Sequence, residues 1–199
     1  MKAINGYNEA KEITGGFEKL PAGGYVCKIT KVEDVENKEY LKITFDIYEG
    51  EYRGWYREQR ERIAENGFDP SYVGTTLRSY KHSALGFFKA FISAVDASNG
   101  TKFGPYVEQG LDEQKLVGAL VGFVIGYEEY ERTKGEKAGS IGQREKVFYV
   151  KPVDKIRSGD FKVPELKKLE GGSQAASNAD ASSDPFAVLD DVDESGLPF

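Results

Sequence analysis

Side chains alternate between apolar and polar along residues 40–48, and this pattern restricts the fold more than any other in the chain. Positions 41, 43, 45 and 47 are Leu, Ile, Phe and Ile, whereas the positions between them carry Tyr, Lys, Thr, Asp and Tyr. A period of two predicts a strand with one face in a core and the other facing water or a ligand. We therefore expect a mainly β domain.

The order of the other elements suggests a particular barrel. Strand patterns recur in four further segments, residues 25–32, 52–59, 120–127 and 146–151. Residues 52–59 follow a short turn, which predicts a hairpin with residues 40–48. Helical spacing begins at Thr76 and stops at Gly100, and Asp112 predicts the cap of a second, short helix. The order matches a five-stranded OB-fold Greek-key barrel with its helix between strands 3 and 4, although other small barrels and sandwiches also fit.

The predicted helix owes its pattern to one apolar stripe. The stripe consists of Leu77, Tyr80, Ala84, Phe88, Phe91 and Val95.

The carboxyl-terminal segment cannot belong to any core. From Gly171 to Phe199 every ionised side chain is acidic, and these six acids account for the net charge of −6, so residues 1–170 are neutral. Such a segment buries too little apolar surface to fold and predicts a disordered acidic tail. The acidic isoelectric point therefore does not argue against an anionic partner such as nucleic acid.

These observations divide the chain into four parts. We expect a flexible amino-terminal arm at 1–16, an OB-fold domain at 17–160, a basic connector at 161–170 and the tail at 171–199. No apolar run approaches the roughly 18 residues that span a bilayer, and no apolar leader follows Met1, so we expect a cytoplasmic protein.

Residue types that carry catalysis are scarce. His82 and Cys27 each occur once, too few for a Cys/His zinc site or a Cys-His nucleophile, and no phosphate-binding loop or nucleophile elbow is present. Cys27 alternates with Tyr25 and Ile29, which predicts a buried thiol. We expect no enzymatic activity, no cofactor and no metal.

A binding surface is predicted instead. Cations that follow phosphates, interleaved with rings on which bases stack, suit single-stranded nucleic acid. On the first three expected strands these residues are Lys28, Tyr40, Lys42, Tyr48, Arg53, Trp55 and Arg57. The loop between the last two strands and the final strand add Arg132, Lys134, Lys137, Arg144 and Lys146. For Trp55, packing in the core is an equally good interpretation.

The chain resembles single-stranded DNA-binding proteins of phages and prophages of Gram-positive bacteria. The resemblance rests on residues 20–25, on residues 41–47 followed by 49–54, and on the end of the tail. The tail resembles the acidic tip of bacterial single-stranded DNA-binding proteins, which ends in Pro-Phe. The resemblance implies a protein of the bacterial host's cytoplasm that coats and protects single-stranded DNA in phage replication, recombination and repair.

The same resemblance implies that the tail recruits other proteins, such as a helicase, recombinase, polymerase or nuclease. The implied partner-binding residues are Asp190, Asp191, Asp193, Leu197, Pro198 and Phe199.

Other functions also fit this sequence. A strand-annealing recombinase or a structural phage protein would share a β-rich core and an aromatic surface. A protein-binding module or inhibitor would act through its tail alone and ignore DNA. A nuclease would require divalent metal. Monomers and homo-oligomers both remain open.

Overall fold

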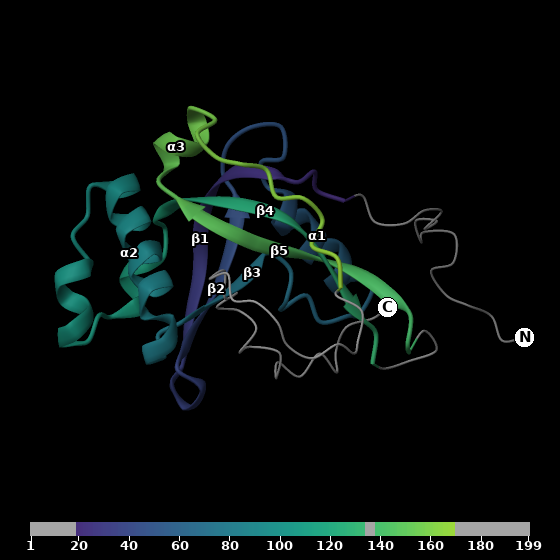
Figure 1. Cartoon of the computed structure of the whole chain (residues 1–199), viewed down its shortest axis with the longest axis horizontal. Helices are drawn as coiled ribbons and strands as arrows, with labels where there is room; N and C mark the ends of the chain where they lie inside the picture. The colour runs from purple at the N-terminus through teal and green to yellow at the C-terminus, as the bar shows by residue number, and fades with distance from the viewer. Residues whose placement is uncertain (1–18, 134–137, 170–199) are drawn as a thin grey trace, which may run out of the picture.

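Five antiparallel strands form one open sheet in the order β3-β2-β1-β4-β5 (Figure 1). The computed structural model describes residues 19–133 and 138–169. The strands are β1 (Gly23–Val35), β2 (Tyr40–Ile47), β3 (Thr75–Ser79), β4 (Leu120–Glu131) and β5 (Ile141–Lys151). The expectation of a mainly β chain with few helices is confirmed.

In the described part of the chain, three α-helices and four short 3-10 helices join or cover the strands. The α-helices are α1 (Trp55–Glu65), α2 (Leu85–Asn99) and α3 (Val153–Arg157). The 3-10 helices are η1 (Glu36–Lys38), η2 (His82–Ala84), η3 (Gly104–Gln109) and η4 (Glu113–Leu116). Figure 1 shows α2 at one end of the sheet, with β4 and β5 crossing in front of β1, β2 and β3.

The inner face of the sheet carries the core. All four apolar positions predicted for residues 41–47 are buried, as is the thiol of Cys27, so both expectations are confirmed. The ring of Phe45 lies edge-on to Phe123 of β4, with centroids 4.7 Å apart. Burial of such rings dominates the stability of a core of this size.

The expected third strand at residues 52–59 is wrong. Gly54 has a φ of 85° and ends the turn after β2, and α1 begins at the next residue. The carboxylate of Asp46 accepts hydrogen bonds from the backbone N–H groups of Tyr56 and Arg57, at 3.0 and 3.4 Å, which satisfies free amides in the first turn of a helix. Aromatic residues favour strands by propensity, but this cap and the burial of Tyr56 favour a helix.

The third strand instead lies at β3, where the sequence predicted the start of a helix. Residues 75–79 pair with β2, and α2 begins only at Leu85. From Ala84 to Val95 the predicted stripe is buried, and that part of the expectation is confirmed. The cap at Asp112 is also confirmed, because its carboxylate accepts a hydrogen bond of 3.1 Å from the N–H of Gln114 in the short helix η4.

Helix α1 connects two strands that the sheet keeps apart. Tyr56 packs edge-on against Phe45 of β2, with centroids 5.2 Å apart, and its hydroxyl donates to the carboxylate of Glu145 on β5. Arg60 donates to the carbonyl oxygens of Phe45 and Val73, at 3.3 and 3.1 Å. Since β1 and β4 separate β2 from β5, these contacts require the sheet to curl around its inner face.

Residues 152–169 cross the outer face of the sheet and rest on three glycines. A Cβ atom on Gly24, Gly122 or Gly126 would lie 2.4 to 2.6 Å from Phe161, Ile156 or Pro164 respectively. Lys167 then pairs with β4 beyond the end of β1, through hydrogen bonds with Tyr127 and Glu129. The glycines therefore let this segment pack directly on the strands.

Replacement of Gly74 by Ala should destabilise the fold more than the same change at Gly100. Both residues have a positive φ, 61° and 66°, but only at Gly74 would the new Cβ lie 2.7 Å from the carbonyl oxygen of Phe45 and from Cβ of Tyr56. We expect a loss of about 1 kcal/mol at Gly100 from backbone strain and roughly 3 kcal/mol or more at Gly74. Urea denaturation of Gly74→Ala and Gly100→Ala measures both losses, and equal losses would contradict the packing argument.

Candidate nucleic-acid interface

Three of the predicted DNA-binding residues lie together on the outer face of the sheet. The Nζ of Lys28 and the guanidinium carbon of Arg53 each lie 5.7 Å from the centroid of the Tyr48 ring, which is 39% exposed. We call Lys28, Tyr48 and Arg53 the Tyr48 cluster. It joins one planar ring to two cations at the end of β2, although the residues come from different elements.

The backbone around the turn after β2 sets this geometry. The N–H of Tyr48 donates to the carbonyl of Val26 at 2.8 Å, which extends the pairing of β2 with β1 and brings Tyr48 near Lys28. The N–H of Gly54 returns to the carbonyl of Ile47 at 2.9 Å and closes the turn that carries Arg53. The cluster therefore depends on a closed turn rather than on a hairpin strand.

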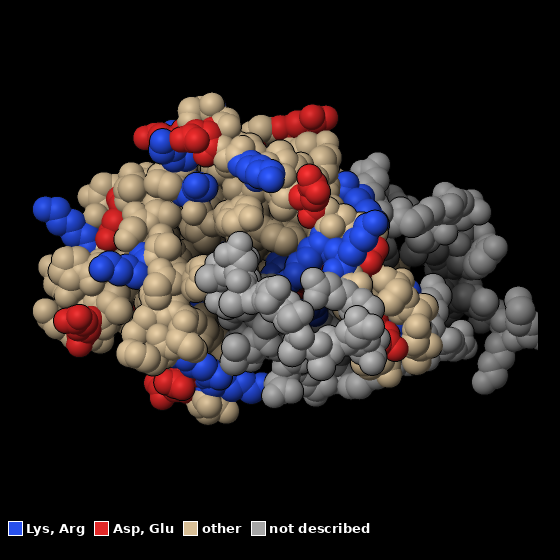
Figure 2. Space-filling model, in the orientation of Figure 1, with Lys and Arg blue, Asp and Glu red and all other residues tan. Residues whose placement is uncertain are grey.

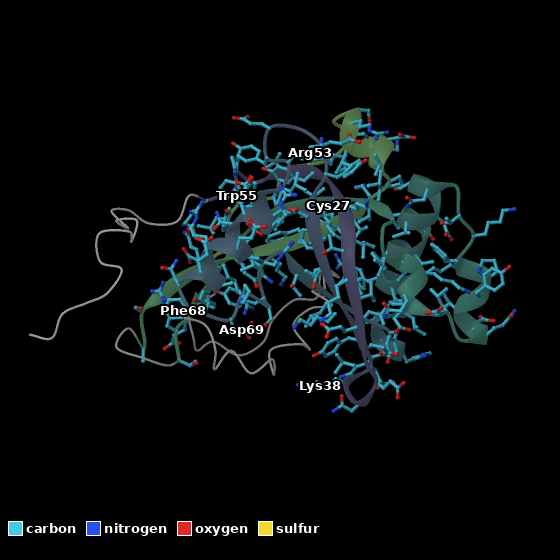
Figure 3. All side chains as sticks on the ribbon, turned by 180° about the vertical axis from the view of Figure 1, so that it is seen from behind. Cys27, Lys38, Arg53, Trp55, Phe68 and Asp69 are labelled. Atoms are coloured by element: carbon cyan, nitrogen blue, oxygen red, sulfur yellow. The ribbon has the colours of Figure 1, made fainter. Side chains whose placement is uncertain are left out.

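The helix α1 removes two predicted residues from the sheet surface. Trp55, its first residue, is half-buried, packs against the core and lies edge-on to Tyr52, with centroids 5.6 Å apart. Arg57 is exposed on the same helix. Figure 3 shows Arg53 and Trp55 on the same side of the molecule, along the upper edge of the view. Of the two interpretations of Trp55, the structure supports core packing for part of its ring.

Two predicted residues on β2 differ in accessibility. Tyr40 is 7% exposed, so little of its ring is available to a ligand. Lys42 is half-buried on the outer face, opposite Glu33 of β1 and Leu77 of β3. Lys42 therefore shares a face with Lys28 but lies further along the strand.

Two predicted cations on β5 surround a carboxylate that sequence reasoning missed. Glu128 of β4 is buried and accepts from Nε of Arg144 at 2.7 Å and from Nζ of Lys146 at 2.8 Å. The guanidinium of Arg144 also lies 5.6 Å from the centroid of the Tyr130 ring. The signal for Glu128 was its position among the alternate residues of β4 that face outward, directly after the inward-facing Tyr127.

Of the remaining predicted residues, Arg132 lies in the part of the chain that the structure describes. Arg132 donates to the hydroxyl of Ser140 at 3.1 Å, across the loop between β4 and β5. Lys134 and Lys137 lie outside the described residues, as do the tail residues Asp190, Asp191, Asp193, Leu197, Pro198 and Phe199.

Cations that follow β5 pair with nearby acids. Arg157 of α3 donates to both carboxylate oxygens of Glu49, at 2.6 and 3.1 Å, which holds the pKa of Glu49 below its ordinary value. Lys155 lies 2.6 Å from the carboxylate of Asp160. These pairs are exposed, so their contribution to stability is small. The main effect of the Arg157–Glu49 pair is to tie α3 to the turn that carries Arg53.

A carboxyl group also lies beside several tyrosines on the inner face of β5. Glu145 accepts a hydrogen bond from the hydroxyl of Tyr56. Burial raises the pKa values of Tyr25 and Tyr127, and the negative charge of Glu145 raises them further. Part of the Glu145 side chain is exposed, but the neighbouring side chains displace water from around its carboxyl group. This desolvation raises the pKa of Glu145 to about 7, and the hydrogen bond from Tyr56 has a smaller, opposing effect.

Within residues 19–133 and 138–169 there is no group of three or more His, Cys, Asp or Glu residues that could hold a metal ion. Among the helices of that part of the chain, none is both long and apolar enough to cross a membrane. Comparison of the chain with protein-family models, with curated proteins and with solved structures gave no match.

Replacement of Glu145 by Gln should flatten the dependence of stability on pH between about 5 and 8. A folded-state pKa of about 7, above the ordinary 4.5, means that wild-type stability is full at low pH and falls as pH rises through 7. Because solvent reaches Glu145, we expect a difference of only about 0.5–1 kcal/mol. Chemical denaturation at several pH values measures it. Glu49→Gln is the control, because a lowered pKa acts only at more acidic pH.

Proposed function

We propose that this chain is a single-stranded DNA-binding protein without catalytic activity, which coats and protects DNA during phage replication or recombination. The observation that carries the proposal is the Tyr48 cluster. An exposed ring between two cations suits a base stacked on the ring and phosphates held by the cations. Recognition of this kind tolerates any sequence, because every base has a planar face.

We further propose that the sheet is an OB-fold that is open at one seam. The pairings of β1 with β2 and β4, of β2 with β3 and of β4 with β5 are those of that barrel, and α2 lies between β3 and β4. The pairing of β3 with β5 that would close the barrel is not found among the described residues. Helix α1 contacts both β2 and β5 from the inside instead.

The outer face of an OB-fold around its second strand is a usual place for oligonucleotides. The Tyr48 cluster lies at the end of β2, and Lys42 lies on the same face of that strand. This agreement between fold and side chains favours nucleic acid over the protein-binding alternatives that the sequence leaves open.

Removal of either cation of the Tyr48 cluster should weaken binding and reduce its dependence on salt. Each phosphate contact that is lost lowers the slope of log affinity against log salt by about 1 or slightly less. Fluorescence anisotropy of labelled oligo-dT, titrated with Lys28→Ala and Arg53→Ala at several salt concentrations, measures affinity and slope. Lys89→Ala, on the exposed side of α2, removes the same charge elsewhere and should change neither.

The same titrations separate the competing functions. Duplex DNA should bind more weakly than oligo-dT, and failure of the unchanged protein to bind oligo-dT would refute the proposal. Rapid pairing of complementary strands would identify an annealing protein, and metal-dependent cleavage would identify a nuclease.

The acidic tail is proposed to recruit partner proteins and to compete weakly with DNA. A random coil with the length of this tail, 29 residues, would span about 30 Å between its ends, enough to reach across the folded part. Deletion of residues 171–199 should therefore raise affinity for oligo-dT at low salt, because six negative charges are removed, and should have little effect at high salt. Anisotropy titrations of the two proteins measure the difference, and equal affinities at low salt would disprove competition.

A further inference from the structure

An irregularity in β5 places two aromatic residues on one face of the sheet. Ile125 of β4 pairs with Val147 and Val124 pairs with Tyr149, so Phe148 is an extra residue between the two pairs. Such a bulge interrupts the alternation of side chains and redirects them. Without it, Phe148 and Tyr149 would point to opposite faces.

Their neighbours show that both rings point outward. Val147 belongs to the main core on the inner face, whereas Val124, opposite Tyr149, belongs to the cluster beneath α3 on the outer face. The ring of Phe148 lies beside Gly126, together with Pro164 of the segment that crosses the outer face. The bulge therefore presents both rings on the face that carries the Tyr48 cluster.

The two rings form an exposed aromatic step. Their centroids are 6.4 Å apart and their planes make an angle of 48°; Phe148 is half-buried and Tyr149 is 52% exposed. The ring of Phe148 lies next to Gly126 and Pro164 on one side and next to the ring of Tyr149 on the other. A half-exposed ring on a supported strand is a surface on which a planar group can stack.

Cations border this step along β5. Lys151 follows it at the next outward position, and Lys146 and Arg144 precede it at the outward positions before the bulge. Figure 2 shows Lys and Arg side chains gathered in the middle of the face along which β5 runs in Figure 1. As in the Tyr48 cluster, aromatic rings lie next to a cation, which here is Lys151, whereas Arg144 and Lys146 pair with the carboxylate of Glu128.

A single row of paired residues joins the two places. The backbone N–H of Tyr48 donates a hydrogen bond to the carbonyl of Val26 in β1. Val26 pairs with Gly122 of β4, and Gly122 pairs with Lys151 of β5. Three strand spacings of about 4.8 Å give a separation of about 14 Å along the sheet. Helix α3 lies over the middle of the row, because Ile156 covers Gly122.

We propose that Phe148 and Tyr149 form a second base-stacking platform, so that a single strand bound at the Tyr48 cluster continues past α3 to β5. This inference rests on the proposed function. It assigns the stacking to Tyr149, which the sequence pattern did not single out, and the neighbouring phosphates to Lys151. A footprint across two platforms fits the several nucleotides that one OB-fold covers.

Substitutions at Tyr149 test the platform by anisotropy titration with labelled oligo-dT long enough to cover both sites. Tyr149→Ala and Tyr149→Leu should weaken binding roughly 5-fold or more with an unchanged salt slope, because a ring and no charge is lost, and Tyr149→Phe should bind like the wild type. Lys151→Ala should lower the salt slope by about 1 or slightly less. Urea denaturation checks that each variant is folded.

Two matched controls separate stacking from simple loss of apolar surface. Ile141→Ala removes a side chain of the same 52% exposure from the same strand, and Tyr106→Ala removes a tyrosine of 56% exposure from η3. Both should bind like the wild type. Unchanged affinity of Tyr149→Ala, in a protein that binds oligo-dT, would overturn the platform alone. Absence of any binding by the wild type would overturn the proposed function and the platform with it.

Discussion

The ring of Phe45 lies between Tyr56 of α1 and Phe123 of β4, with centroids 5.2 and 4.7 Å away, and this contact ties the helix to both halves of the sheet. Its position follows from the alternation of β2, which sends Phe45 inward and Asp46 outward. Asp46 then caps the start of α1, whose Tyr56 returns to the ring of Phe45. Two neighbouring residues of one strand thus determine where the next helix begins and how it packs.

Because this helix closes the inner side of the curled sheet, the binding that we propose takes place on the outer face. The turn between β2 and α1 is closed by the hydrogen bond from Gly54 to Ile47, and it holds Arg53 next to Tyr48. The segment after β5 covers only part of that face, where three glycines let it lie directly on the strands. The proposed DNA-binding surface is therefore the part of the outer face that residues 152–169 do not cover.

Sequence reasoning succeeded where one residue's neighbours along the chain decide its environment. The alternation of residues 41–47, the buried thiol of Cys27 and the cap at Asp112 are all local patterns, and the structure confirms each of them. It failed at residues 52–59, because the aromatic residues there favour strands, whereas a cap from Asp46 and a contact across the core favour a helix. The pairing of Arg144 and Lys146 with Glu128 was missed because it joins residues of two strands.

By itself, the sequence determined the mainly β character of the chain, the inward and outward sides of β2, and the separation of a neutral part from an acidic end, since periodicity and charge can be counted along the chain. Only the tertiary structure decided that Lys28 and Arg53 meet at Tyr48, that Trp55 begins a helix, and that a bulge turns Phe148 and Tyr149 to the same side. These outcomes depend on strand register and on contacts between distant segments. A shift of one residue in register reverses the face of every side chain that follows, and no local pattern specifies where such a shift occurs.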